Sequence, residues 1–176
     1  MPKNSTVILI RHAEKPEDAS DFNLAPAGRA RAHAYVAYFQ NLALDGQPIQ
    51  IRRMVAAADS AESQRPKLTV MPLALATNLE IHDRHADSDY AALATHVLSH
   101  PKYDNADTLI CWHHGYIVEL AHALGAPEGE LPAKWPDDVY GWLLALHFDA
   151  DGKVARFTFI NESLMHGDHG KAPRKR

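Results

Sequence analysis

The sequence has one cysteine, no long apolar run and no excess of positive charge. A single cysteine, Cys111, cannot form an intrachain disulfide, and its apolar neighbours indicate a buried thiol in a reducing compartment. With 18 Lys and Arg against 22 Asp and Glu, the formal net charge of −4 does not suit binding to the phosphate backbone of nucleic acids. The first apolar stretch, Val7 to Ile10, is too short for a secretion signal or a membrane span. We therefore expect a cytoplasmic protein with no nucleic-acid or membrane partner.

Length and composition indicate one globular domain. The chain has 176 residues, of which 46% are hydrophobic and 23% charged, so collagen-like and disordered classes are excluded. Residues 1–165 are expected to form this domain. Residues 166–176 end in a block of Lys and Arg without an acid, which is typical of a flexible basic tail. The composition is unusual only in its 12 histidines, whose grouping therefore matters.

Apolar runs and helical periodicities alternate along the chain. Continuous β-branched and aliphatic runs are typical of strands buried on both faces, whereas apolar residues three and four apart indicate amphipathic helices. The expected strands are 6–10, 51–58 and 107–112, with a hairpin of 140–148 and 154–160. The expected helices are 26–42, one that contains Arg65 and is kinked or restarted at Pro72, one from an N-cap at Ser88 to Pro101, and one from Gly115 to Gly125. This alternation predicts an α/β protein, a three-layer α/β/α sandwich with a mostly parallel central sheet.

Two of the expected buried strands end in histidine. Arg11 and His12 follow the first strand, and His113 and His114 follow the third. Because the carboxyl ends of parallel strands meet at one edge of a sheet, we expect these side chains to converge there, joined by Arg65. Guanidinium and imidazole groups hold tetrahedral dianions such as phosphate, and a neutral imidazole is also a nucleophile toward phosphorus. Consecutive strand side chains point to opposite faces. The sequence therefore favours two interpretations of His113 equally: a residue of the pocket, or a histidine packed in the core.

Three motifs in this order resemble the histidine phosphatase superfamily, also called the phosphoglycerate mutase-like superfamily. Residues 11–16, Arg-His-Ala-Glu-Lys-Pro, are similar to its first signature, and residues 65–69, Arg-Pro-Lys-Leu-Thr, are similar to its arginine-plus-threonine helix. Residues 112–115, Trp-His-His-Gly, are similar to its second strand-end histidine motif. The likeness covers about residues 6–125 and implies a phosphoglycerate mutase-like fold.

The resemblance also implies roles for individual residues. His12 is expected to attack phosphorus and to carry the phosphoryl group, while Arg11, Arg65 and His114 hold the non-bridging oxygens. Lys15 is expected to bind substrate at the rim of the pocket. The resemblance implies no metal ion and no organic cofactor, and the other histidine pairs lack the glutamate or cysteine partners typical of zinc sites.

The proton donor for the leaving group is left open. Ala13 stands where the family usually has glycine, and Gly115 follows His114 where the phytase-like branch has an acidic aspartate. The mutase-like branch uses a glutamate between the second and third strands, and this interval and the strand ends offer several carboxylates. The candidates are Asp59, Asp83, Glu80, Asp89 and Glu14, with Asp87 in the same interval.

These motifs predict a phosphomonoester hydrolase of the histidine acid phosphatase type, with a small phosphorylated substrate or a phosphoprotein as its partner. Three alternatives stay open. A protein-phosphohistidine phosphatase would need the open pocket that a short chain provides. A non-catalytic phosphoryl-ligand binding module would result if the acid has been lost. A mutase is less well suited, because the interval between residues 65 and 107 is short for a segment that closes over the pocket.

Overall fold

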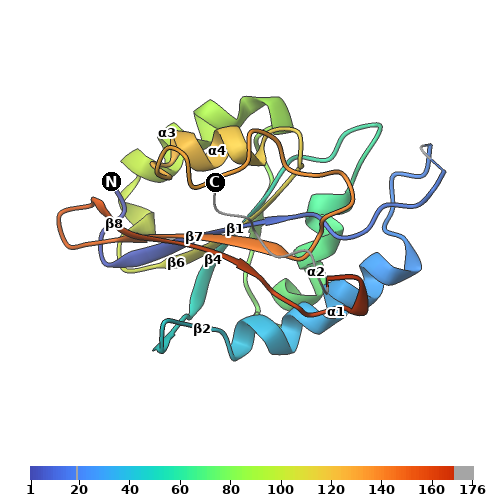
Figure 1. Ribbon diagram of the computed structural model, residues 1–176, viewed down its shortest axis with the longest axis horizontal. Coiled ribbons are helices and arrows are strands. Elements are labelled where there is room, and N and C mark those ends of the chain that lie inside the picture. The colour runs from blue at the N-terminus through green and yellow to red at the C-terminus, as the bar shows by residue number, and fades with distance from the viewer. Residues whose placement is uncertain (19, 169–176) are drawn as a thin grey trace.

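A six-stranded sheet forms the centre of the protein in the computed structural model, which describes residues 1–18 and 20–168 (Figure 1). The strand order is β5-β4-β6-β1-β7-β8. Strands β5, β4, β6 and β1 are parallel to one another, β7 runs antiparallel to β1, and β8 runs antiparallel to β7. The strands are β1 (Ser5–Arg11), β4 (Ile51–Ala56), β5 (Ile81–His82), β6 (Asp107–Trp112), β7 (Trp142–Phe148) and β8 (Val154–Asn161). A separate small hairpin consists of β2 (Ala43–Leu44) and β3 (Gln47–Pro48).

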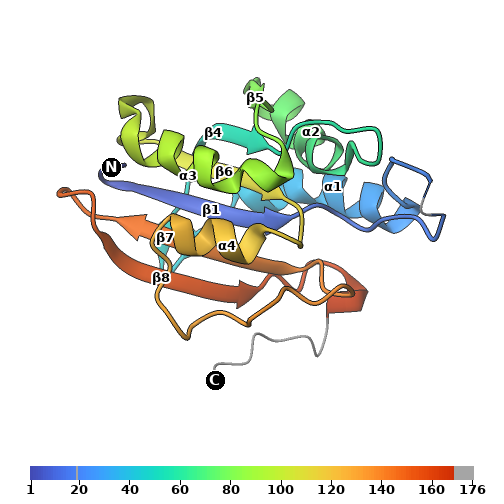
Figure 2. The same ribbon diagram turned by 90° about the horizontal axis from the view of Figure 1, so that it is seen from above.

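Helices cover both faces of the sheet, which confirms the predicted three-layer α/β/α sandwich. Helices α1 (Pro26–Gln40) and α2 (Arg65–Thr77) lie on one face, and α3 (Tyr90–Ser99) and α4 (Ile117–Ala123) lie on the other (Figures 1 and 2). Three short 3-10 helices complete the elements: η1 (Asp87–Asp89), η2 (Pro101–Tyr103) and η3 (His166–Asp168). No helix of residues 1–18 and 20–168 is both long and apolar enough to cross a membrane.

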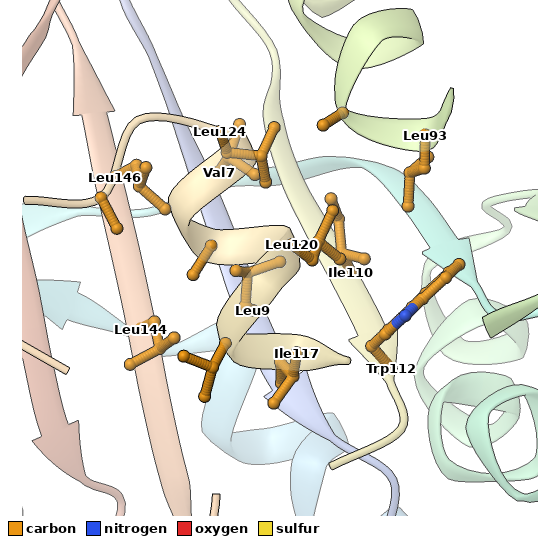
Figure 3. Close-up of a cluster of buried hydrophobic side chains, with 14 of the residues drawn as sticks. Val7, Leu9, Leu93, Ile110, Trp112, Ile117, Leu120, Leu124, Leu144 and Leu146 are labelled. Carbon is orange, nitrogen blue, oxygen red and sulfur yellow. The ribbon is translucent and has the colours of Figure 1, made fainter. Parts of the chain in front are cut away.

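The central strand β1 explains why its sequence shows no alternation. Val7 and Leu9 belong to the apolar cluster under α3 and α4 (Figure 3), whereas Ile8 and Ile10 belong to the cluster under α1 and α2. All four side chains are inaccessible to solvent. Burial of each such side chain stabilises the fold by about 1.5–3 kcal/mol, so a continuous apolar run is favoured wherever both faces of a strand are covered.

Several boundaries differ from the prediction. Helix α3 begins at Tyr90 after the 3-10 turn η1 instead of at a Ser88 cap, and α4 begins at Ile117 after a turn that contains Gly115. Helix α2 continues through Pro72 as one helix. The two-residue strands β2, β3 and β5 escaped prediction because such short segments carry no periodicity.

The ordered domain extends beyond the predicted boundary at residue 165. Residues 166–168 form η3, and Asp168 is buried with its carboxylate 2.7 Å from the guanidinium of Arg31. Gly141 lies so close to Asp168 that a Cβ atom there would collide with its carboxylate. These contacts move the end of the domain to residue 168 at least. The remainder of the predicted tail, residues 169–176, lies outside the described residues.

Candidate active site

The rings of His12 and His113 contact each other at the carboxyl edge of the sheet. Arg11 ends β1, Trp112 ends β6, and the parallel register pairs these two residues. The residues that follow are therefore adjacent, and the N–H of His12 donates to the carbonyl of Trp112 at 3.0 Å. The ring centroids of His12 and His113 are 5.0 Å apart, and the ring planes meet at 66°. The strand register thus builds a pair of imidazoles from two distant motifs.

One nitrogen of His12 is available as a nucleophile. Its Nδ1 lies 2.7 Å from the carbonyl oxygen of Ala13, which can only accept, so Nδ1 carries the proton and Nε2 keeps its lone pair. Burial lowers the pKa of His12 well below its usual range, and the neighbouring His113 and Arg11 lower it further. His12 is therefore neutral near neutral pH, the state that nucleophilic attack requires.

Arg11 is completely buried, yet only part of its guanidinium is paired. Its Nη1 donates to three carbonyls of the loop before β7, those of Pro136 (3.1 Å), Asp137 (2.8 Å) and Val139 (2.9 Å). The guanidinium carbon also lies 4.0 Å from the ring centroid of Tyr140. Neither Nε nor Nη2 has a hydrogen-bond partner within the described part of the chain. Buried donors without partners are rare in folded proteins, and these two suit an anionic ligand.

Arg65 reaches the histidine pair from the first turn of α2. Its Nη1 donates to the carbonyl of Asp21 at 2.7 Å and its Nη2 to that of Glu62 at 3.2 Å, whereas its buried Nε has no described partner. Its positive charge contributes to the lowered pKa of both His12 and His113. Arg65 is therefore close enough to act on both rings through its charge.

Thr69 fixes the position of α2 relative to the nucleophile. Its buried hydroxyl accepts the N–H of Ala13 at 2.8 Å and donates to the carbonyl of Arg65 at 2.7 Å. The loop after β1 and the first turn of α2 are thus joined through one side chain. The arginine-plus-threonine motif owes its spacing to this bond, because the threonine lies one helical turn after the arginine.

His113 lies in the site, a role that the sequence left open. Its pKa is lowered to about 4, chiefly by burial and also by the charges of Arg65, His114 and Arg11, while the charge of Asp87 opposes the shift. His113 is therefore neutral and can donate one ring N–H to an oxygen held near His12. The strand pattern alone could not identify it, since alternation predicts only that neighbouring histidines point apart.

His114 has different contacts. Its Nε2 lies 2.9 Å from Oδ1 of Asp137, and its Nδ1 is buried without a described partner. No ring contact joins it to His12. Burial lowers the pKa of His114 and the charge of Arg11 lowers it further, while Asp137 opposes the shift. Lys15 is exposed, and its charge also lowers the pKa of His114, so Lys15 lies at the outer side of this group. His114 is thus placed beside Arg11 and the loop before β7.

Most carboxylates proposed from the sequence are already paired. Lys67 lies 2.7 Å from Asp83 and 3.5 Å from Asp59, and these contacts raise the pKa of Lys67. Glu14 lies 2.7 Å from the buried guanidinium of Arg31 on α1. These three carboxylates are therefore held in ion pairs with lysine or arginine.

Asp87 is the carboxylate whose charge acts on His113, whereas Asp137 acts on His114. It opposes the lowering of the pKa of His113, and its backbone carbonyl accepts the indole N–H of Trp112 at 3.1 Å. Glu80 is 77% exposed and lies 4.0 Å from Nδ1 of His82, while Asp89 is exposed at the end of η1. From the sequence, Asp87 was only one of several acids between the second and third strands. Its relation to His113 depends on how η1 packs against β6, which the sequence does not show.

The site combines neutral imidazoles with guanidinium donors and suits an anion. Across residues 1–18 and 20–168, no group of three or more His, Cys, Asp or Glu side chains is arranged to hold a metal ion. The groups around His12 are Arg11, Arg65, His113 and Tyr140, whose ring centroid lies 6.2 Å from that of His12. Such a set can hold a phosphoryl group and offer it a lone pair.

Comparison with solved structures identifies the fold. The sequence matches no protein-family model and no curated protein. The structure is similar to a phosphoglycerate mutase from Plasmodium falciparum, with TM-score 0.56 and 12% identity over 92% of each chain. It is also similar to mycobacterial glucosyl-3-phosphoglycerate phosphatase solved with VO3, with TM-score 0.53 and 16% identity over 88% of this chain and 96% of that one.

A third similar structure is that of a proposed phosphohistidine phosphatase, SixA, from Agrobacterium tumefaciens. Its TM-score is 0.51 and its identity is 20%, over 89% of this chain and 96% of the other. These three proteins belong to the histidine phosphatase superfamily. At such low identities the likeness establishes the fold, so the predicted phosphoglycerate mutase-like fold is confirmed.

Proposed function

We propose that the protein is a phosphomonoester hydrolase that acts through a covalent phosphohistidine on His12. The observation that carries this proposal is the state of His12, a buried neutral imidazole whose Nδ1–H is bound to the Ala13 carbonyl. The charges of Arg11 and Arg65 both act on His12, and both guanidinium groups have buried N–H donors without described partners. A nucleophile and donors for a dianion are therefore present in one site. The fold that this chain shares with known phosphatases agrees with the proposal.

The chemistry proceeds in two displacements. In the first, Nε2 of His12 forms a bond to phosphorus while the bond from phosphorus to the leaving oxygen breaks, and that oxygen takes up a proton. Arg11, Arg65 and a histidine N–H stabilise the charge on the non-bridging oxygens. In the second, water attacks phosphorus and the N–P bond breaks, which returns neutral His12 and releases inorganic phosphate. The net reaction is hydrolysis of a phosphate monoester to an alcohol and phosphate.

The donor to the oxygens is assigned to His113 together with the predicted His114. His113 contacts the His12 ring, whereas His114 lies beside Arg11 and Lys15. Lys15 remains the candidate for binding the substrate at the rim. A cytoplasmic location, predicted from the single cysteine, belongs to the same proposal.

For the leaving group we assign proton donation to Asp87, the carboxylate whose charge acts on His113. Asp87→Asn is expected to lower turnover of an alkyl phosphate by about 10²-fold or more, because its leaving alkoxide needs a proton. Turnover of a nitrophenyl phosphate should change far less, since that leaving group is stable as an anion. Asp89→Asn, in the same 3-10 turn, is the matched control. An equal effect of Asp87→Asn on both substrates would exclude this role.

A protein-phosphohistidine phosphatase is the second candidate. The residues between α2 and β6 form α3 and short turns, and Leu93, Ala94 and Val97 of α3 pack in the core. The helix of this interval therefore packs on the sheet and adds no long segment over His12, which favours a phosphohistidine on a protein surface as the substrate. Activity on a histidine-phosphorylated protein, compared with activity on small alkyl phosphates, separates the two candidates.

The nucleophile is tested with a chromogenic aryl phosphate. His12→Ala is expected to lower turnover by at least about 10³-fold, because the covalent route is lost. His33→Ala, at an exposed position on α1, is the matched control and should retain wild-type turnover. Brief incubation of wild-type protein with labelled substrate should trap an acid-labile, base-stable phosphoenzyme that His12→Ala cannot form. Equal turnover in His12→Ala would refute the nucleophile, and binding of vanadate without any turnover by wild type would indicate a non-catalytic module.

A further inference from the structure

A cavity of about 460 Å³ lies beside α3 and the edge strand β5. We call it the histidine pocket, because its polar lining consists of His82, His85, His96, His100, Arg84 and Lys102. None of the residues assigned to the active site lines it. The volume is within the range of cavities that bind small molecules.

The polar groups of this pocket repel one another. The pKa of Lys102 is lowered by burial and then by the charges of Arg53 and Arg84, and the pKa of His96 is lowered by burial and then by Lys102 and His100. The acid that opposes these charges at Lys102 is Glu80, whose side chain is 77% exposed. Lys102 lies over the ring of Tyr103, with Nζ 5.0 Å from the ring centroid. Converging positive groups without a buried counter-ion attract an anion.

The hydrogen bonding of His100 favours an anion over a metal ion. His96 and His100 are one helical turn apart, with ring centroids 5.2 Å apart, a spacing that could also suit zinc. However, Nδ1 of His100 accepts the backbone N–H of Lys102 at 3.2 Å, so in the neutral ring Nε2 carries the proton and donates. A metal ion would also lie beside the charges of Lys102 and Arg84. The donors of the pocket are therefore those of an anion site.

The remaining lining is apolar. Val55, Leu93 and Tyr103 line the same cavity and also belong to the core cluster beneath α3. A ligand that fits both parts carries a negatively charged group for the cations and a hydrocarbon or aromatic part for this floor.

We propose that the histidine pocket is a second ligand site, which binds small organic dianions that join a phosphoryl or phosphonyl group to an apolar part. The site is independent of the proposed phosphatase activity, because none of its side chains contacts the His12 pair. It does share a segment with the active site: the carbonyl of His85 accepts the N–H of Ala58 at 2.8 Å, and that of Asp87 accepts the Trp112 indole at 3.1 Å. His85, which lines the histidine pocket, is two positions before Asp87, the residue assigned to proton transfer.

The test uses phenylphosphonate, a dianion with an aromatic ring that cannot be hydrolysed as a phosphate ester. Side-chain NMR signals of His96 and His100 should shift and saturate as wild-type protein is titrated, and methylphosphonate should bind more weakly because it lacks the ring. The double variant Arg84→Gln/Lys102→Gln should weaken this binding by about tenfold or more, since two of the cationic partners are removed. Arg52→Gln/Lys153→Gln removes two exposed charges outside the pocket and is the matched control.

Two further measurements separate this site from the active site. Arg11→Lys should leave the shifts of His96 and His100 intact while it weakens phosphonate binding at His12. Thermal unfolding of each variant checks that the fold is retained. Unchanged affinity at His96 and His100 in the Arg84→Gln/Lys102→Gln variant would overturn the proposal. So would shifts of these histidines on Zn²⁺ addition with none on phenylphosphonate.

Discussion

Two buried arginines, Arg11 and Arg31, differ in what surrounds them. Arg31 on α1 is 1% exposed and pairs with three carboxylates, those of Glu14 (2.7 Å), Asp168 (2.7 Å) and Glu162 (3.6 Å). Hydrogen bonds to Asp168 and Glu14 raise the pKa of Arg31 above its ordinary value in spite of burial. Arg11 is equally buried, forms no ion pair with a described carboxylate, and has a lowered pKa because burial dominates.

The difference separates a cation that is fully paired within the fold from one that keeps unpaired donors. A buried charge that is fully paired holds neighbouring elements together, and Arg31 joins α1 to the loop after β1 and to η3. A buried charge with unpaired donors costs stability until a partner binds. In the proposed function, the unpaired donors of Arg11 bind the non-bridging oxygens of the phosphoryl group.

The largest effect is expected from Arg31→Met. Removal of this guanidinium leaves the carboxylates of Glu14 and Asp168 close together, beside the carboxyl group of Glu162, with no cation between them, so we expect the free energy of unfolding to fall by about 3–5 kcal/mol. Chemical denaturation measures this change. Arg29→Met, at an exposed position on the same helix, should change stability by no more than about 0.5 kcal/mol. A stable Arg31→Met variant would show that the three carboxylates are not held as an ion network.

Arg11→Lys should have the opposite profile. Lysine can still donate to the loop carbonyls, so we expect stability to change by only about 1 kcal/mol, but it lacks the planar fork. Turnover of an aryl phosphate per folded molecule should fall by about 10²–10³-fold. Vanadate should also stabilise wild-type protein against thermal unfolding more than it stabilises the variant. If Arg11→Lys lost stability but kept turnover, the two arginines would both be structural.

A smaller effect concerns pH. Burial raises the pKa of Glu162 to about 8 from an ordinary value of 4.5, although Arg31 and a hydrogen bond from Tyr35 oppose this shift. The folded protein therefore keeps a proton that the unfolded chain releases between these values, so the contribution of Glu162 to stability falls as pH rises from about 5 to about 8. Glu162→Gln removes this dependence. As pH rises across this range, the free energy of unfolding of the variant should increase relative to that of wild type. If the two free energies changed with pH in the same way, the raised pKa of Glu162 would be contradicted.

Local sequence was sufficient to predict most of the architecture. The buried strands β1, β4 and β6, the hairpin of β7 and β8, and all four helices follow from apolar runs and helical periodicity. The same patterns placed Arg11 and His12 at a strand end and Arg65 at a helix start. Boundaries such as the start of α3 were less accurate, because η1 replaces a simple cap.

Contacts between distant residues were not predictable in this way. Glu14 was a candidate acid from its place near a strand end, but its carboxylate is paired with Arg31, which in turn is paired with Asp168 in the predicted tail. His113 and His114 are adjacent in sequence, and only the packing around them shows that the first contacts His12 and the second contacts Asp137.

The sequence by itself determined which residue types stand at the ends of the central strands, because a buried strand must be apolar and its polar end marks the edge of the sheet. The tertiary structure decided which of those side chains meet, which donors are left unpaired and which carboxylates are neutralised. These outcomes depend on the register of β1 against β6 and on contacts with distant loops, such as the loop before β7 that binds Arg11. Register and loop return are set by packing over the whole domain, and local periodicity does not encode them.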